Sequence, residues 1–144
     1  MESGKRQEDI LEKSYLDLKQ LSNEIENYYN ELMREDYELN KWVKEGQKID
    51  ENIKTFQELL KLVIKNFEDA KKDNRIKEET LSAVNEGLNK IRKEVEPKVE
   101  KMLEKISRIK KIIKFQQRVW GIIGIILIIV AQFLFYKFDF YINI

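Results

Sequence analysis

One stretch of this chain restricts its fold more than any other feature. Residues 119–136 (VWGIIGIILIIVAQFLFY) contain no charged side chain. As an α-helix they would rise roughly 27 Å, close to the thickness of the hydrocarbon core of a bilayer. A helix at the surface of a soluble core keeps a polar face, but the only polar side chain inside this stretch is Gln132. The sequence therefore predicts a transmembrane helix over residues 119–136.

The residues on either side of this stretch predict its orientation. Trp120 and Tyr136 stand at its two ends, where aromatic side chains anchor a span at the membrane interfaces. Six basic residues and no acidic one occur in residues 105–118, whereas the short tail 137–144 has one of each sign; the basic residues are Lys105, Arg108, Lys110, Lys111, Lys114 and Arg118. The excess of positive charge before the span predicts a single-pass protein whose residues 1–118 are cytoplasmic.

The basic segment 97–118 also predicts a ligand. Basic residues close to a membrane attract anionic lipid headgroups by about 1 kcal/mol each. A nucleic acid is the rival ligand for such a run, but exposed aromatic side chains are not interleaved with these charges. We therefore expect a bilayer with anionic headgroups as the partner, and no nucleic acid.

The rest of the chain has the composition of long helices. Charged residues make up 37% of the chain, and it has only five Gly and one Pro. Apolar residues recur at heptad spacing through residues 9–96, after a short N-terminal stretch, 1–8, that we expect to be flexible. This predicts an all-α fold of long heptad-patterned helices, as a coiled coil or an elongated helical bundle, followed by one C-terminal transmembrane helix. The predicted helix-packing seam consists of Leu11, Leu18, Ile25, Leu32, Leu39, Ile53, Phe56, Leu60, Val63, Phe67, Leu81 and Leu88.

Two arrangements satisfy this seam. Breaks are expected near Gly46, in the polar stretch 71–75 and at Pro97. The heptad phase continues across all three, which favours a straight helix in a parallel homo-oligomeric stalk. The alternative is a chain that folds back, with helices near 50–72 and 76–96. Asn74 is either a polar residue that fixes the register of the seam or a turn residue.

The sequence does not predict catalytic, cofactor-binding or metal-binding residues. The chain has no Cys and no His, which removes thiol chemistry, thiolate metal sites and the side chain that normally titrates near neutral pH. Its carboxylates fall beside lysines, as on solvated helix faces. We expect no enzyme activity and no cofactor. Gly121, Gly124 and Gln132 are candidates for contacts between spans.

These features favour a tail-anchored scaffold, tether or adaptor that forms homo-oligomers and binds a helical protein partner. An alternative is a membrane-perturbing or pore-forming protein, because the layout resembles small lysis-accessory proteins that join a charged coiled coil to a C-terminal span. The layout is also similar to that of SNARE fusion proteins, which place a heptad region before a C-terminal anchor. Pro97, about twenty residues before the span, departs from the continuous helix that such a fusion protein needs.

Overall fold

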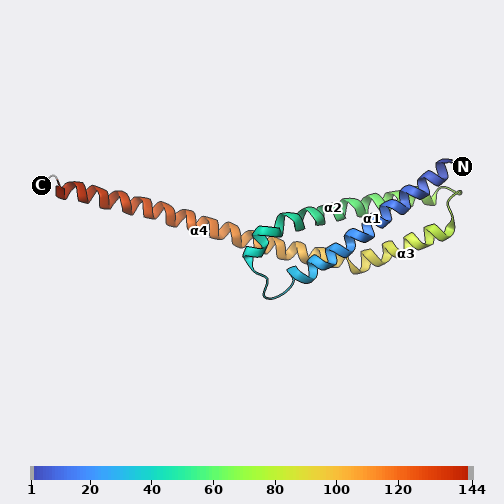
Figure 1. Cartoon of the computed structure of the whole chain (residues 1–144), viewed down its shortest axis with the longest axis horizontal. Helices are drawn as coiled ribbons and strands as arrows, with labels where there is room; N and C mark the ends of the chain where they lie inside the picture. The colour runs from blue at the N-terminus through green and yellow to red at the C-terminus, as the bar shows by residue number, and fades with distance from the viewer. Residues whose placement is uncertain (1, 143–144) are drawn as a thin grey trace. The chain divides into compact units, whose positions relative to one another are not determined.

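The computed structural model describes the backbone of residues 2–142 and the side chains of residues 5–139 and of Ile142. Within these residues the chain is helical and has no strand. It divides into two compact units, Met1–Lys105 and Ile106–Ile144. The four helices, drawn in Figure 1, are α1 (Glu2–Leu32), α2 (Leu39–Lys71), α3 (Glu78–Glu94) and α4 (Glu96–Ile142). Helix α4 begins in the first unit and continues in the second.

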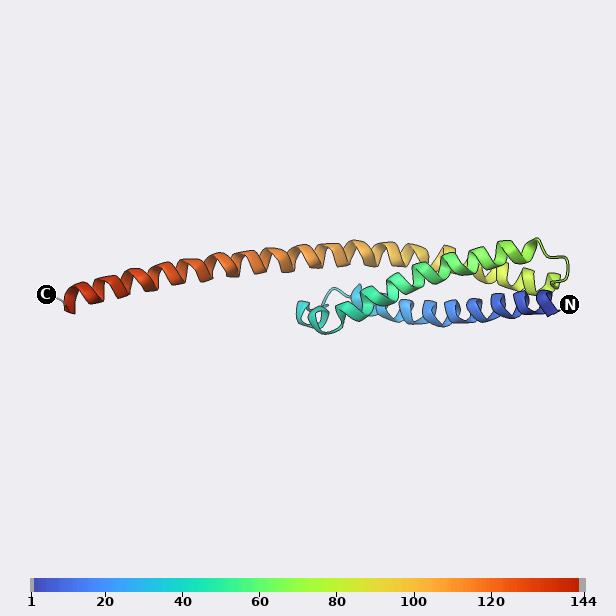
Figure 2. The ribbon, with the colours of Figure 1, turned by 90° about the horizontal axis from the view of Figure 1, so that it is seen from above.

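In the first unit α2 runs antiparallel to α1, as Figures 1 and 2 show. Two polar contacts fix the register. Asn66 Nδ2 donates to Ser14 Oγ at 3.3 Å, and Asn52 Nδ2 donates to the Tyr28 hydroxyl at 3.0 Å. Fourteen residues forward along α1 therefore correspond to fourteen residues back along α2.

Helix α3 and the first residues of α4 run parallel to α1. Thr80 Oγ1 donates to Glu8 Oε1 at 2.8 Å, and Lys98 Nζ lies 3.5 Å from Glu26 Oε1. Both pairs are 72 residues apart along the chain. The constant offset shows that the start of α4 continues along α1 in the direction that α3 sets, so the first unit is a three-helix bundle.

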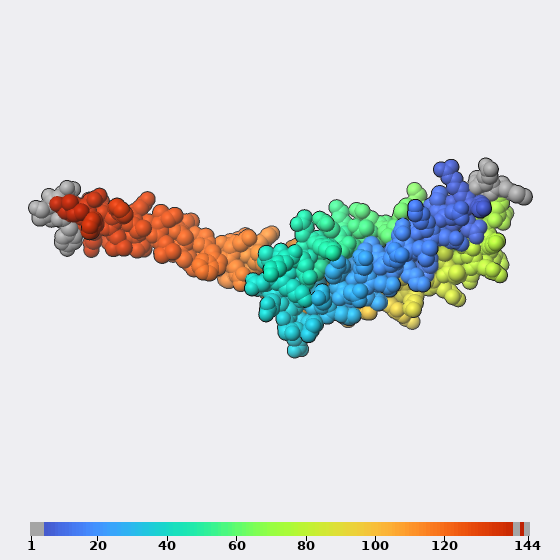
Figure 3. All heavy atoms as spheres, in the orientation of Figure 1, coloured from blue at the N-terminus to red at the C-terminus, as the bar shows by residue number. Residues whose placement is uncertain are grey.

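The core of this bundle is the heptad stripe of each helix, turned toward the other two. Leu11, Leu18, Ile25 and Leu32 of α1 are completely buried. Helix α2 contributes the longest regular stripe, whose buried members are Trp42, Gly46, Ile49, Ile53, Phe56, Leu60, Val63, Phe67 and Ala70. Figure 3 shows one face of the bundle, on which α1 lies between α2 and α3.

This arrangement corrects the straight stalk that the heptad phase favoured. The fold-back alternative, with helices near 50–72 and 76–96, is the closer description. Each large apolar side chain that leaves water contributes about 1.5–3 kcal/mol. A single chain gains this free energy by folding back, because its helices bury their apolar stripes against one another and need no partner chain to cover them.

The first reversal lies at residues 33–38, where the sequence analysis expected no break. The expected break at Gly46 is absent, because α2 continues through that residue. The reason is local: a Cβ at Gly46 would lie 2.5–2.9 Å from the indole of Trp42, one helical turn earlier. The glycine therefore makes room for a large core side chain and does not end the helix.

The second reversal, residues 72–77, overlaps the polar stretch 71–75, whose first residue still belongs to α2. Asp73 organises it, because its Oδ1 accepts hydrogen bonds from the backbone nitrogen of Arg75 at 3.0 Å and from Nε of the same residue at 2.9 Å. A short acidic side chain that binds the backbone two residues ahead is a common turn device. Asn74 is exposed in this turn, so it is a turn residue and not a buried polar seam residue.

The interruption at Pro97 is small. Helix α3 ends at Glu94, Val95 intervenes, and α4 begins at Glu96, so Pro97 stands in a first turn, where its missing N–H is tolerated. The buried stripe shifts by one position here, because Ile91 is followed eight residues later by buried Val99 and not seven residues later by residue 98. At the other end of the bundle, α1 begins at Glu2, inside the stretch 1–8 expected to be flexible, and Met1 lies outside the described residues.

Candidate membrane-binding segment

The predicted span is helical throughout, within α4. Among the described residues, one helix is long and apolar enough to cross a membrane, and none of its 18-residue apolar window is buried. The exposed fractions of its large apolar side chains range from 37% for Val119 to 73% for Phe135. A continuous exposed apolar surface of this kind marks a membrane or protein contact.

Aromatic side chains stand at both ends of the span. Trp120 is 71% exposed and Tyr136 is 73% exposed, so both are available to the headgroup region of a bilayer. The basic residues Arg108, Lys110, Lys111, Lys114 and Arg118 are exposed as well. Helix α4 continues to Ile142 through the segment expected to be a short far-side tail, and residues 143 and 144 lie outside the described part.

Lys105 has a different environment from the other basic residues of the segment. It closes the first unit, where its Nζ donates to the carbonyl oxygen of Arg34 at 3.1 Å and lies 5.7 Å from the centre of the Tyr37 ring. The predicted lipid collar therefore starts with a residue whose ammonium group binds the first reversal of the bundle.

Tyr37 is the centre of a polar cluster at that reversal. Its hydroxyl donates to Glu45 Oε1 at 3.0 Å, and Lys41 Nζ lies 5.9 Å from its ring centre. Lys41 also forms an ion pair with Glu31, at 2.9 Å. Partial burial, and then the carboxylate of Glu45, raise the pKa of the Tyr37 phenol above its ordinary value of 10.0. The cluster holds the α1–α2 reversal and the end of the first unit together.

The glycines separate into two kinds. Packing explains why positions 46 and 87 are glycines: a Cβ at Gly46 would collide with Trp42, and a Cβ at Gly87 would collide with Tyr15. A Cβ at Gly121 or Gly124 would meet no atom within 4 Å. Packing inside the described chain therefore does not explain the two glycines of the span. Gln132, the third candidate for a contact between spans, is exposed.

The predicted seam residues lie in the bundle core. Most of them are buried, whereas Leu39 and Leu81, next to the two reversals, are half-buried. The residues that the sequence offered for association between chains are therefore occupied inside one chain.

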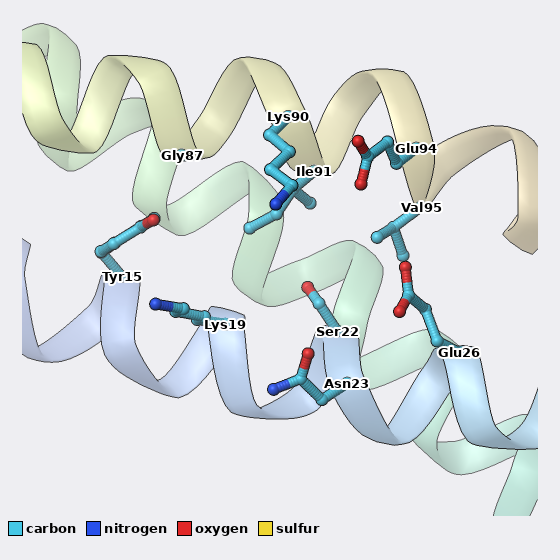
Figure 4. A pocket seen from close by; sticks show the side chains of 10 residues that line it. All are labelled: Tyr15, Lys19, Ser22, Asn23, Glu26, Gly87, Lys90, Ile91, Glu94 and Val95. Carbon is cyan, nitrogen blue, oxygen red and sulfur yellow. The ribbon is translucent and has the colours of Figure 1, made fainter.

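Sequence reasoning missed a hollow between α1 and α3, which Figure 4 shows with α2 behind it. Tyr15 lies over Gly87 on one side, and the buried Ser22 faces Ile91 and Val95 on the other, leaving a space of about 140 Å³. Tyr15, Ser22 and Tyr29 recur every seven residues on α1. Ser22, the small member of this series, was the signal for a hollow.

The described residues contain no group of three His, Cys, Asp or Glu placed to hold a metal ion. Their buried side-chain nitrogen and oxygen atoms all have hydrogen-bond partners. Buried Ser14 and Ser22 donate to carbonyl oxygens of their own helix, at 3.1 and 2.7 Å. These polar groups therefore serve the packing of the bundle. No family model, no curated protein and no solved structure matches the chain.

Proposed function

We propose that this protein is a membrane-anchored adaptor: α4 crosses a bilayer, and the three-helix bundle offers its outer faces to protein partners. The observation that carries the proposal is the contrast between the helices. The bundle helices each bury an apolar stripe, whereas the apolar window of α4 has no buried part. A lipid bilayer is the environment that covers a helix on all sides at once.

The free energy supports insertion. Twelve of residues 119–136 are Val, Ile, Leu or Phe. At the centre of a span each contributes −0.3 to −0.6 kcal/mol on the biological insertion scale, about −5 kcal/mol together. Gln132 opposes insertion, but it lies near one end of the stretch, where its amide can reach the interface.

The exposed charges support a cytoplasmic bundle. Arg108, Lys111, Lys114 and Arg118 precede the span and are exposed, and such residues remain on the cytoplasmic side and attract anionic headgroups. The bundle closes its own core, so partners would bind its outer faces and not its heptad stripes. Its role would be to hold such partners at the membrane.

Membrane insertion is tested with the full chain and synthetic liposomes. Ile126→Arg combined with Ile129→Arg places two charges near the middle of the span, at about 2.5–3.5 kcal/mol each. We expect the wild-type chain to float with the liposomes and to resist extraction at alkaline pH, and the double variant to remain in solution or be extracted.

The matched control is Leu62→Arg, an exposed position on α2. It adds the same kind of charge to the bundle and should float like the wild type. Flotation of the double variant at the wild-type level would refute the anchor, because a surface attachment through basic residues does not depend on the middle of α4.

A further inference from the structure

Three exposed apolar side chains line one side of α4 where the basic segment meets the predicted span. Ile112 is 46% exposed, Phe115 is 68% exposed and Val119 is 37% exposed. They are spaced three and four residues apart, so they lie one above another on the same side of the helix. Ile112 and Phe115 precede the uncharged stretch 119–136. We call these three residues the juxtamembrane stripe.

The other sides of α4 stay polar up to the span. Gln116, Gln117 and Arg118 are consecutive and exposed, and they point in directions about 100° apart around the helix. Gln117 stands roughly 200° from Phe115, which places it opposite the juxtamembrane stripe. The apolar surface of α4 therefore begins earlier along the stripe than on any other side of the helix.

The first two charges after the span are offset in the same sense. Lys137 follows Val119 after about five helical turns, so it lies on the side of the juxtamembrane stripe. Asp139 comes two residues later, on the opposite side. Phe135, one turn before Asp139 on that opposite side, is 73% exposed. The uncharged surface therefore both begins and ends earlier on the side of the stripe.

An uncharged surface with oblique ends fits a tilted helix, because a helix that stands upright in a bilayer meets each interface at one level all round. Two residues rise about 3 Å along the axis, and side chains on opposite sides of a helix are roughly 10 Å apart. A tilt of about 17° toward the stripe therefore brings Phe115 to the depth of Gln117, and it brings Lys137 level with Asp139. Transmembrane helices are tilted by about 20° on average.

We propose that the juxtamembrane stripe is a lipid-contact surface: α4 crosses the bilayer at a tilt above about 17°, and the stripe lies in the headgroup–acyl boundary of the cytoplasmic leaflet. Continuity with the exposed apolar surface of the span selects lipid as the occupant. Lys111 and Arg118 are exposed beside the stripe and carry the charge that attracts anionic headgroups. Their apolar stems can lie along the stripe while their charged ends reach the headgroups. This inference rests on the proposed function, because it requires the anchor.

Cysteine accessibility tests the tilt in the full chain, since the natural sequence has no Cys. Phe115→Cys and Gln117→Cys are reconstituted separately in liposomes of phosphatidylcholine and phosphatidylserine. A membrane-impermeant maleimide labels them from the water, and each rate is divided by the rate for Leu62→Cys, an exposed position of the bundle. We expect Gln117→Cys to react several-fold faster than Phe115→Cys, although position 117 is closer to the middle of the span. In an upright helix the order is reversed, because position 115 then lies farther from the hydrocarbon.

Substitutions in the stripe make the test specific. In the Gln117→Cys chain, Ile112→Ser combined with Phe115→Ser removes the apolar contact from the opposite side of α4. The helix should then stand more upright, and labelling at position 117 should become slower by about twofold or more. The matched control is Ile112→Leu combined with Phe115→Leu, which keeps the stripe apolar and should leave the rate unchanged. A serine pair that does not slow labelling at position 117 would overturn the role of the stripe.

Equal rates at the two positions, or a faster rate at position 115, would overturn the tilt. A second copy of the chain that covered the stripe would give the expected order of rates, and dilution separates it from lipid. Protection of position 115 by lipid persists when the protein-to-lipid ratio is lowered, whereas loss of protection on dilution would overturn the assignment to lipid.

Ile126→Cys, near the middle of the span, separates failure of the tilt from failure of the anchor. If position 126 resists labelling but position 117 reacts no faster than position 115, only the tilt is refuted. Labelling of position 126 at the rate of Leu62→Cys would refute the anchor itself.

Discussion

Replacing Gly46 by alanine sets two effects against each other. Alanine is the better helix former by about 0.8–1.0 kcal/mol, and Gly46 lies well inside α2. The new methyl group, however, would stand 2.5–2.9 Å from three atoms of the Trp42 indole. Trp42 is only 6% exposed, so its ring has no free space into which it can turn. Overpacking of a core costs about 1–3 kcal/mol, so we expect net destabilisation of up to about 2 kcal/mol once the gain in helix propensity is subtracted.

A double-mutant cycle separates the two effects. In a chain carrying Trp42→Ala the collision is gone, so the same Gly46→Ala change should stabilise the protein by up to about 1 kcal/mol. The assay is urea unfolding of the full chain in mild detergent, followed by circular dichroism. The sign of the Gly46→Ala effect should reverse between the two backgrounds. Stabilisation in both would refute the packing reason for this glycine and leave only helix propensity.

Three further predictions concern the bundle. In urea unfolding, Leu18→Ala should destabilise the bundle by about 2–5 kcal/mol, because Leu18 is fully buried. Leu16→Ala should destabilise it by less than about 0.5 kcal/mol, because Leu16 is 57% exposed. Equal effects of the two variants would show that the heptad stripe is not the core. The raised pKa of Tyr37 means that the folded chain favours the neutral phenol, so the contribution of Tyr37 to stability is complete below pH 10.0 and is lost as the pH rises above that value. An absorbance titration should show one tyrosine that ionises after the others. Tyr37→Phe should remove this late step from the titration. One glycine inserted in the reversal 33–38 should change the urea midpoint little, whereas one inserted between Ile53 and Phe56 should abolish cooperative unfolding, because it rotates half of the α2 stripe out of the core.

The helices and their buried faces could be predicted from the sequence because each depends on local periodicity. A residue that recurs every third or fourth position points to one side of a helix whatever lies opposite. Leu18 and Val63 are buried for this reason, and both are fully covered.

The side chains that pack between helices could not be predicted in this way. That Tyr15 lies over Gly87 depends on the offset of 72 residues between α1 and α3, which no local pattern contains. Tyr37, Lys105 and the carbonyl of Arg34 meet for the same reason, since they come from the first reversal and from α4. The hollow beside Ser22 is a property of two facing surfaces, so one periodic stripe can suggest a small residue but not the space in front of it.

The continuity of the heptad phase misled the sequence analysis because it was treated as a property of one straight helix. The heptad phase is kept whenever the last stripe residue of one helix and the first stripe residue of the next are a multiple of seven residues apart. Leu32 ends the stripe of α1 and Leu39 begins α2, seven residues later, across a reversal of six residues. Phe67 and Leu81 are fourteen residues apart across a second reversal of six. The length of a loop depends on the path that the chain takes, so a loop can preserve the seven-residue spacing of the stripe although it contains no helical turn. What distinguishes a bundle from a stalk is therefore the capacity of the intervening residues to reverse the chain, as Asp73 does by binding the backbone of Arg75.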